Sequence, residues 1–184
     1  MIEGVRVFDT ILDSSNIKDT ISRNSADWKF SYERVHSLSD LSYFCSKKIK
    51  ENVIIFSGHG NSTGGFYLSN GECFSPESDL SFPEKNHDKI IIFSSCLIGD
   101  NERLCLDFKK FFNAEHIFAY RHEMQDRFCF LNESILLTFF EHKTLTSFSH
   151  PNFTKKDFED FQDKTDFMKN MNESHRRLHP MVMY

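Results

Sequence analysis

Short apolar runs separated by helical patterns constrain this chain more than any other feature. Three of them cover Val5–Phe8, Val53–Phe56 and Ile90–Phe93, and a weaker fourth covers Ile117–Tyr120. Runs of this length predict strands that are buried on both faces. Strands that alternate with helices predict a mostly parallel central sheet with helices on both sides, so the expected fold class is an α/β/α sandwich.

The stretches between and after these runs predict three helices. The first is expected from Ser39, as its N-cap, to about Ile49. The second is expected from Asp100 or Asn101 to about Phe112, and the third spans 126–141. In each stretch apolar side chains recur every three or four residues, which is typical of a helix that lays one face on a core.

Two further stretches predict strands outside the buried runs. Asp27–Val35 alternates aromatic and polar residues, which favours an additional strand near an edge of the sheet. Gly65–Phe74 predicts a small β-hairpin that turns at Asn70-Gly71, because both central positions of a type I′ turn need positive φ. We expect this hairpin to lie outside the parallel core.

The composition changes near Ser149, and Pro151 marks a break. At 184 residues the chain suits one globular domain with a short appendage. We therefore expect a main domain over residues 1–150 and a C-terminal helical extension over residues 151–184. The extension carries dense charge with interspersed Phe and Met, which is typical of a helix that docks on the domain or on a partner.

Charge and cysteine usage exclude several classes of function. The net charge is −5 and the 22 Lys and Arg residues are dispersed, so no basic groove for nucleic acid is expected. No stretch approaches the roughly 20 apolar residues of a membrane span, and no basic leader is present, so a cytoplasmic location is expected. Five cysteines without a CxxC pair favour reduced thiols over a disulfide frame or a zinc site.

Two of the buried runs end on residues that carry chemistry. His59 follows the second run between Gly58 and Gly60, and Cys96 follows the third run. Ligands of parallel sheets bind beyond the carboxyl ends of the strands, so neighbouring strands would project both side chains from one edge. A thiol beside an imidazole is an activated nucleophile, and the N–H groups of Gly60 and Cys96 would bind an oxyanion. The pair predicts a catalytic Cys-His dyad.

These residues resemble a known family. "IIFSGHG" followed by "IIIFSSC" resembles the caspase-like cysteine peptidases, in which a His-Gly and a Cys follow adjacent core strands. "GGFYLSNGECFSP" and "AEHIFAYRHEMQDRF" are similar to the hairpin and the next strand of the CHAT branch of that group. Over residues 50–142 the resemblance implies a thiol protease that cleaves a protein substrate without a cofactor. It also implies activation by a sensor or regulatory protein, as in prokaryotic antiviral defence.

The substrate pocket departs from the caspase pattern. Ser94 and Ser95 precede Cys96 in place of the Gln-Ala of caspases, so aspartate specificity is not implied. Asp9, Asp100 and Asp126 are the acidic candidates for a pocket that binds a basic P1 side chain. Asp100 and Asp126 are also plausible helix caps.

Other readings of the same residues stay open. His59 and Cys96 with another histidine would be zinc ligands, but no H-x₃-H or C-x₂-C spacing supports a metal site. His116 and His122 flank the fourth run and would either line the site or pack as ordinary histidines. A catalytically silent caspase-like interaction module is the main alternative function. A flavodoxin-like phosphotransfer or ligand-binding domain lacks its phosphate loop, because "FSGHGNSTGG" does not fit G-x-G-x-x-G.

Overall fold

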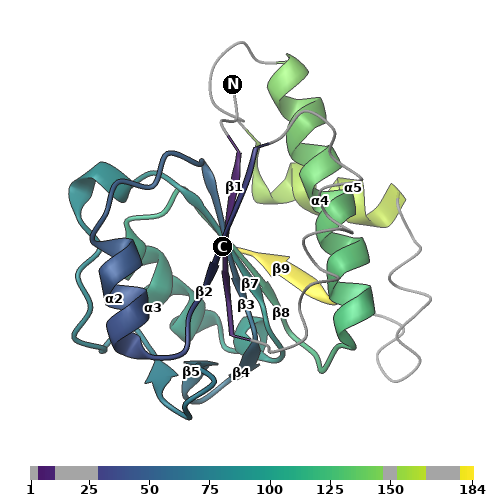
Figure 1. The fold of residues 1–184 in the computed structure, drawn as a ribbon. Coiled ribbons are helices and arrows are strands. Elements are labelled where there is room, and N and C mark those ends of the chain that lie inside the picture. The colour runs from purple at the N-terminus through teal and green to yellow at the C-terminus, as the bar shows by residue number, and fades with distance from the viewer. Residues whose placement is uncertain (1–3, 11–28, 147–152, 165–178) are drawn as a thin grey trace.

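The fold centres on a six-stranded sheet in the order β2-β1-β3-β7-β8-β9. A computed structural model describes residues 4–10, 29–146, 153–164 and 179–184. The strands run in chain order over β1 Val5–Asp9, β2 Phe30–Arg34, β3 Val53–Ser57, β7 Ile90–Ser94, β8 His116–Tyr120 and β9 Met181–Met183. All neighbours pair in parallel except β9, which is antiparallel to β8 (Figure 1). The four expected core strands are confirmed and lie side by side.

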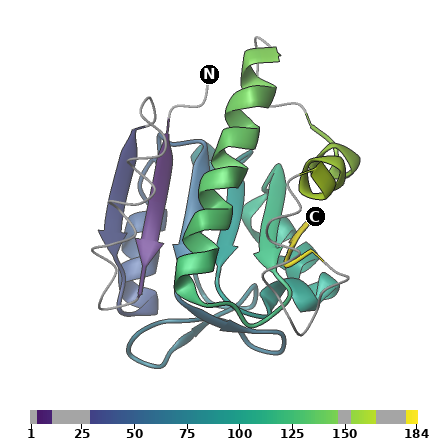
Figure 2. The same cartoon turned by 90° about the vertical axis from the view of Figure 1, so that its right-hand side faces the viewer.

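Helices cover both faces of this sheet. On one face lie α2, Leu38–Cys45, and α3, Glu102–Phe112, and on the other lie α4, Asp126–Thr146, and α5, Lys155–Lys164 (Figure 1). Alternate residues of each central strand face opposite layers, so Ile54 packs toward α2 and α3 and Ile55 toward α4 and α5. Figure 2 shows α4 running along its face of the sheet. The three-layer α/β architecture expected from the runs is present.

Capping side chains set the first residues of α2 and α3, and the start of α2 differs from the expected one. Ser37 is the N-cap of α2 instead of Ser39, because its hydroxyl accepts from the Asp40 amide while the Asp40 carboxylate accepts from the Ser37 amide. The helix then ends at Cys45, short of Ile49. Asn101 caps α3 by accepting from the Leu104 amide. Among the described residues, none of the helices has the length and apolar character needed to cross a membrane.

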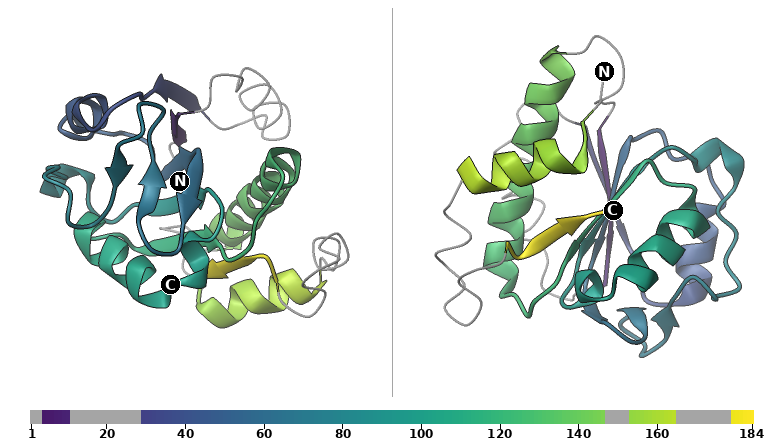
Figure 3. Two further views of the ribbon diagram at one scale, coloured as in Figure 1. Left: turned by 90° about the horizontal axis from the view of Figure 1, so that it is seen from below. Right: turned by 180° about the vertical axis from the view of Figure 1, so that it is seen from behind.

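A second, three-stranded sheet follows β3. It contains β4, His59–Asn61, β5, Gly65–Tyr67, and β6, Cys73–Phe74, in antiparallel order (Figure 3, left). The expected hairpin is confirmed, but its turn is not type I′, because Gly71 has positive φ (88°) and Asn70 does not. The Gly71 amide donates to the Leu68 carbonyl at 2.9 Å. The turn therefore needs one left-handed residue, and glycine supplies it.

The edge strand expected within Asp27–Val35 is β2, which pairs with β1 at one end of the sheet. Its pairing begins at Phe30, and Trp28 lies outside the described residues. Two 3₁₀ turns, η1 at Glu84–Asn86 and η2 at Ile98–Asp100, precede β7 and α3. The η2 turn begins directly after Cys96 and Leu97.

The described part of the C-terminal segment packs on the core and adds a strand to the sheet, alongside the expected helix. A helix is present over Lys155–Lys164, but residues 181–183 form β9 on the sheet. Phe158 packs edge-to-face on Phe118 of β8, with the ring centroids 5.0 Å apart. Phe153, Met181 and Met183 are also buried in the cluster between the sheet and α4. A three-residue apolar strand is too short to be recognised by periodicity, so only pairing with β8 reveals it.

Candidate active site

The register of β3 and β7 places the two candidate catalytic residues at one edge of the sheet. Ser57 and Ser94 are register partners at the carboxyl ends of these neighbouring strands. The chain continues from each of them by two residues, to His59 and to Cys96. One further hydrogen bond ties the ends together, from the Gly58 amide to the Ser94 carbonyl at 3.1 Å. His59 and Cys96 therefore leave the sheet side by side, at the edge where parallel sheets bind ligands.

Gly60 packs directly against the backbone around Cys96. A Cβ atom at this position would lie 2.9 Å from the Cys96 carbonyl oxygen and equally close to Ser95 Oγ and a side-chain carbon of Ile98. Real Cβ atoms do not approach other atoms so closely, so only glycine fits here. The strand that carries His59 and the segment that carries Cys96 are thus in van der Waals contact.

Cys96 is partly buried and its sulfur contacts the backbone of Met124. The Met124 amide donates to Sγ at 3.3 Å, and Sγ lies 3.6 Å from the Met124 carbonyl. The next residue, Leu97, has a left-handed backbone with φ of 64°. A branched side chain in this region is strained, and such residues gather at functional turns. No sequence signal other than its place after β8 pointed to Met124.

The backbone at Cys96 has donor capacity left for a substrate. Its amide makes no hydrogen bond to any described residue, while its carbonyl accepts from the Ile98 amide at 2.9 Å. Gly60 lies in β4 opposite Phe66. The free amide of Cys96 meets the requirement for one arm of an oxyanion hole, which is a preorganised N–H at the nucleophile itself.

His59 presents an exposed imidazole. It is the first residue of β4 and pairs with Tyr67 of β5 through the backbone. Within the described part of the chain its ring makes no hydrogen bond, to the Cys96 sulfur or to any other group. An exposed ring on a short strand is free to turn toward a bound substrate, and catalytic hydrogen bonds are often absent in a resting enzyme.

Two serine hydroxyls lie buried under the candidate dyad. Ser57 Oγ and Ser95 Oγ are shielded from solvent and have no hydrogen-bond partner among the described residues. Unpaired buried polar atoms are uncommon in folded cores, because each costs desolvation energy without a compensating bond. Their presence at these two strand ends marks the edge as functionally unusual.

The three acidic candidates for a P1 pocket do not form one cluster. Asp9 ends β1, is fully buried, and accepts a hydrogen bond from the Tyr32 hydroxyl. Asp100 is exposed at the end of η2 and borders an open cavity with Ser62 and Thr63. Asp126 opens α4. Asp100 is exposed, whereas Asp9 is buried and already paired.

The two histidines near the fourth strand lie at opposite ends of it. His116 begins β8, and its ring stacks on Phe153 at 4.6 Å, so it is remote from the carboxyl end and does not line the site. His122 follows the carboxyl end of β8 and is buried. Within the described ranges, no group of three or more His, Cys, Asp or Glu side chains is arranged to hold a metal ion.

The other thiols differ from Cys96 in their surroundings. Burial raises the pKa of Cys45 to about 12, and burial together with the Glu102 charge does the same for Cys105. Cys129 is buried, and the pKa of the half-buried Cys73 is raised by burial. Thiols with raised pKa values react slowly with electrophiles. Among the five cysteines, Cys96 alone sits at the carboxyl edge of the central sheet, beside His59.

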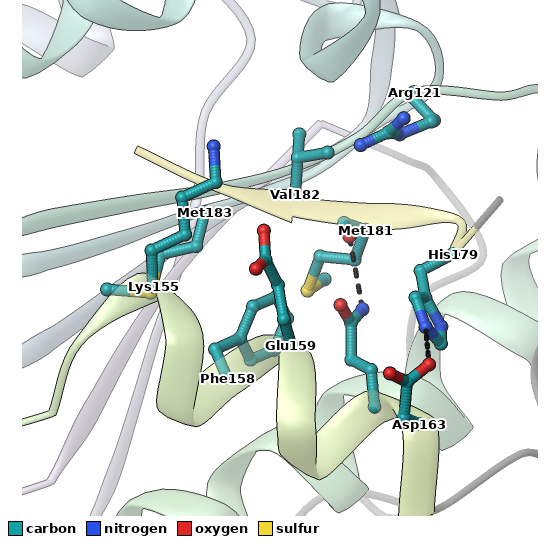
Figure 4. A pocket seen from close by; sticks show the side chains of 10 residues that line it. Arg121, Lys155, Phe158, Glu159, Asp163, His179, Met181, Val182 and Met183 are labelled. Atoms are coloured by element: carbon teal, nitrogen blue, oxygen red, sulfur yellow. Dashed lines mark hydrogen bonds and ion pairs between the residues drawn. The ribbon is translucent and has the colours of Figure 1, made fainter.

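A cavity of about 280 Å³ lies away from the dyad, between α5 and β9 (Figure 4). Gln162 donates to the Met181 carbonyl at 3.0 Å, and His179 contacts the Asp163 carboxylate at 2.8 Å. These polar groups already pair α5 with the β9 segment. The cavity is therefore a packing feature of the C-terminal segment and not part of the site.

No protein-family model matches the chain, and a search of curated proteins finds no similar sequence. The functional argument depends on the geometry at the carboxyl ends of β3 and β7.

Proposed function

We propose that this protein is a cysteine endopeptidase of the caspase-like group, with Cys96 as nucleophile and His59 as acid–base partner. The observation that carries the proposal is the pairing of Ser57 with Ser94, which delivers an imidazole and a thiol to the same sheet edge. The resemblance of the flanking motifs to the CHAT branch supports the same chemistry. A thiol and an imidazole that follow neighbouring strand ends are the two groups that such a dyad needs, and the adjacency of their strands supports the proposal.

The reaction follows from the groups at this edge. His59 takes the thiol proton, and Cys96 Sγ attacks the peptide carbonyl carbon to form a C–S bond. The oxyanion accepts hydrogen bonds from the Cys96 amide and from that of Gly60, each typically worth about 3 kcal/mol to the transition state. The imidazolium then protonates the leaving amine as the C–N bond breaks. A water molecule, deprotonated by His59, hydrolyses the thioester and restores the thiol.

The substrate in this proposal is a protein cut after Arg or Lys. Asp100 is the exposed carboxylate nearest in sequence to the nucleophile, and a carboxylate pairs with guanidinium by charge-assisted hydrogen bonds. Activation by a partner protein and a role in prokaryotic defence follow from the resemblance alone.

One observation favours the silent interaction module as a second candidate. The Cys96 sulfur contacts the Met124 backbone and makes no hydrogen bond to His59 in the described structure. A module without catalysis would keep the fold and this contact. The two candidates differ in whether the thiol ever becomes available to a substrate.

Replacement of either dyad residue tests the proposal. Cys96→Ala and His59→Ala should each abolish cleavage of a fluorogenic Arg or Lys peptide library, with melting temperatures close to wild type. Cys73→Ala is the matched control, since Cys73 is a half-buried thiol on the adjacent hairpin, and it should retain activity. A wild-type protein that cleaves no member of the library, alone or with the product of a neighbouring gene, would support the silent module.

A further inference from the structure

We propose that the connection between β8 and α4, residues 121–125, is an inhibitory latch that covers Cys96 through the backbone of Met124. A protein substrate reaches the sulfur only after this latch opens. The inference rests on the proposed peptidase function and states how the same site is regulated.

The latch is defined by a two-sided contact with the nucleophile. Cys96 Sγ accepts from the Met124 amide at 3.3 Å and faces the Met124 carbonyl at 3.6 Å. Both backbone groups come from the β8 side of Cys96, because β7 lies between β3 and β8 in the sheet. His59 occupies the β3 side. The sulfur is therefore enclosed on one flank by the chain's own main chain, and in this proposal that main chain occupies the place of the substrate backbone.

Both ends of the connection are held by hydrogen bonds. At its start the Arg121 amide donates to the Pro180 carbonyl at 2.8 Å, next to β9. At its end the amides of Phe128 and Cys129 donate to the Gln125 carbonyl, which begins the turns of α4. In this proposal the residues between these two ties are the part that moves when the latch opens.

The middle of the connection carries two side chains that face the protein interior, the buried His122 and the half-buried Met124. Met124 is half-buried and packs against the core cluster between the sheet and α4. Glu123 and Gln125 on either side are exposed. Hydrogen bonds that involve sulfur are weak, so in this proposal the packing of the Met124 side chain, beside the buried His122, helps to keep the Met124 backbone on Cys96. Such a contact is strong enough to close the site and weak enough for a partner to open it.

In this proposal the strands bring Cys96 and His59 to one edge of the sheet, while the Met124 backbone obstructs the Cys96 sulfur. This accounts for the absence of a hydrogen bond between Cys96 and His59, which the silent module also explains. The latch differs from the silent module because it predicts that the thiol becomes reactive when Met124 is released.

The test measures the rate at which iodoacetamide alkylates Cys96 in the full chain, followed by mass spectrometry of the peptide that contains it. Met124→Ala removes the anchor and keeps the backbone N–H. It should raise the alkylation rate about fivefold or more, as expected when a small side-chain contact controls a minor open state. Glu123→Ala, on the exposed neighbour, should leave the rate at the wild-type value. Met124→Leu, which restores an apolar anchor of similar volume, should return the rate close to wild type.

Hydrogen exchange is a second measurement, and it can be interpreted even if a variant is partly destabilised. The Met124 amide should exchange slowly in the wild type and much faster in Met124→Ala, while amides of β7 stay protected. An alkylation rate in Met124→Ala that equals or falls below that of the wild type, with β7 still protected, would overturn the latch.

The outcomes separate the latch from the peptidase proposal. Faster alkylation in Met124→Ala without cleavage of any peptide would retain the latch and reject the peptidase. Peptide cleavage by the wild type with no change of alkylation or turnover in Met124→Ala would retain the peptidase and reject the latch. Faster alkylation together with faster cleavage would support both.

Discussion

The Gly58 amide donates a hydrogen bond to the Ser94 carbonyl at 3.1 Å, one residue before His59 and two residues before Cys96. This bond extends the β3–β7 ladder past the last register pair, Ser57 and Ser94. The two chain segments are thus tied together up to the residues just before His59 and Cys96. Sites carried by regular elements hold their geometry more tightly than sites carried by loops.

Substitution of Gly60 by alanine should damage the site without unfolding the protein. The added Cβ would meet three atoms of the Ser95–Ile98 segment at 2.9 Å, so that segment must shift away from β4. Overpacking of this kind costs about 1–3 kcal/mol. We expect turnover of a peptide substrate to fall roughly tenfold or more, because a shift of about 1 Å is enough to misalign the nucleophile with the substrate carbonyl.

Gly71→Ala is the matched control for this substitution. Gly71 also requires glycine, since its φ is 88°, but a Cβ there meets no atom within 4 Å. The variant should lose stability in urea unfolding and keep its turnover. Equal losses of turnover in the two glycine variants would show that the effect of Gly60→Ala is general destabilisation.

The C-terminal segment should be required for stability. Phe158 is 3% exposed and contacts Phe118, so Phe158→Ala should lower the free energy of unfolding by about 3–5 kcal/mol, measured by urea denaturation. Lys156→Ala, at an exposed position of α5 two residues before Phe158, should change it little. A stable chain truncated after residue 150, with native circular dichroism, would contradict the inclusion of α5 and β9 in the core.

Stability should fall in mild acid through His116. Burial, with a smaller effect of the Lys109 charge, lowers the pKa of His116 to about 4, and this outweighs the nearby Glu115 carboxylate at 3.8 Å. The unfolded chain has a histidine pKa of about 6.5. Between these values the unfolded state binds more protons, so the contribution of His116 is complete above pH 6.5 and is lost as the pH falls toward 4.

His116→Phe should therefore reduce the loss of unfolding free energy between pH 7 and pH 4.5. The phenyl ring keeps the stacking on Phe153 and cannot bind a proton. Urea unfolding at the two pH values measures the difference, and a proton NMR titration of the imidazole measures the midpoint. A midpoint near that of a free histidine would refute this assignment.

The P1 preference should depend on Asp100. In Asp100→Asn, the rate at which the protein cleaves library peptides after Arg or Lys should fall about tenfold or more. The neutral amide side chain cannot form the charge-assisted hydrogen bond that the carboxylate makes to a guanidinium. Asp79→Asn, on an exposed carboxylate outside the strand ends, is the control. Cleavage after Asp, or only after small apolar residues, would remove the basic preference and leave the dyad untouched.

Local patterns in the sequence account for much of this fold. The buried runs at β1, β3, β7 and β8 are recognisable because strands covered on both faces have no polar alternation. Ser39 as the start of α2 is two residues late, although the Ser37-x-x-Asp40 spacing is itself a capping signal. Asn70-Gly71 predicts the hairpin, but its turn type depends on a backbone angle that residue identity does not specify.

The positions of His59 and Cys96 at the ends of two apolar runs were determined by sequence alone, because strand length and termination depend on neighbouring residues. Three features were decided only by tertiary structure: the adjacency of β3 and β7, the capture of the C-terminal Met181–Met183 as β9, and the return of Met124 onto the Cys96 sulfur. Each depends on segments distant along the chain that meet through backbone pairing or side-chain packing. No local periodicity encodes such a meeting, because the free energy that selects it comes from burying whole faces of the sheet and helices against one another.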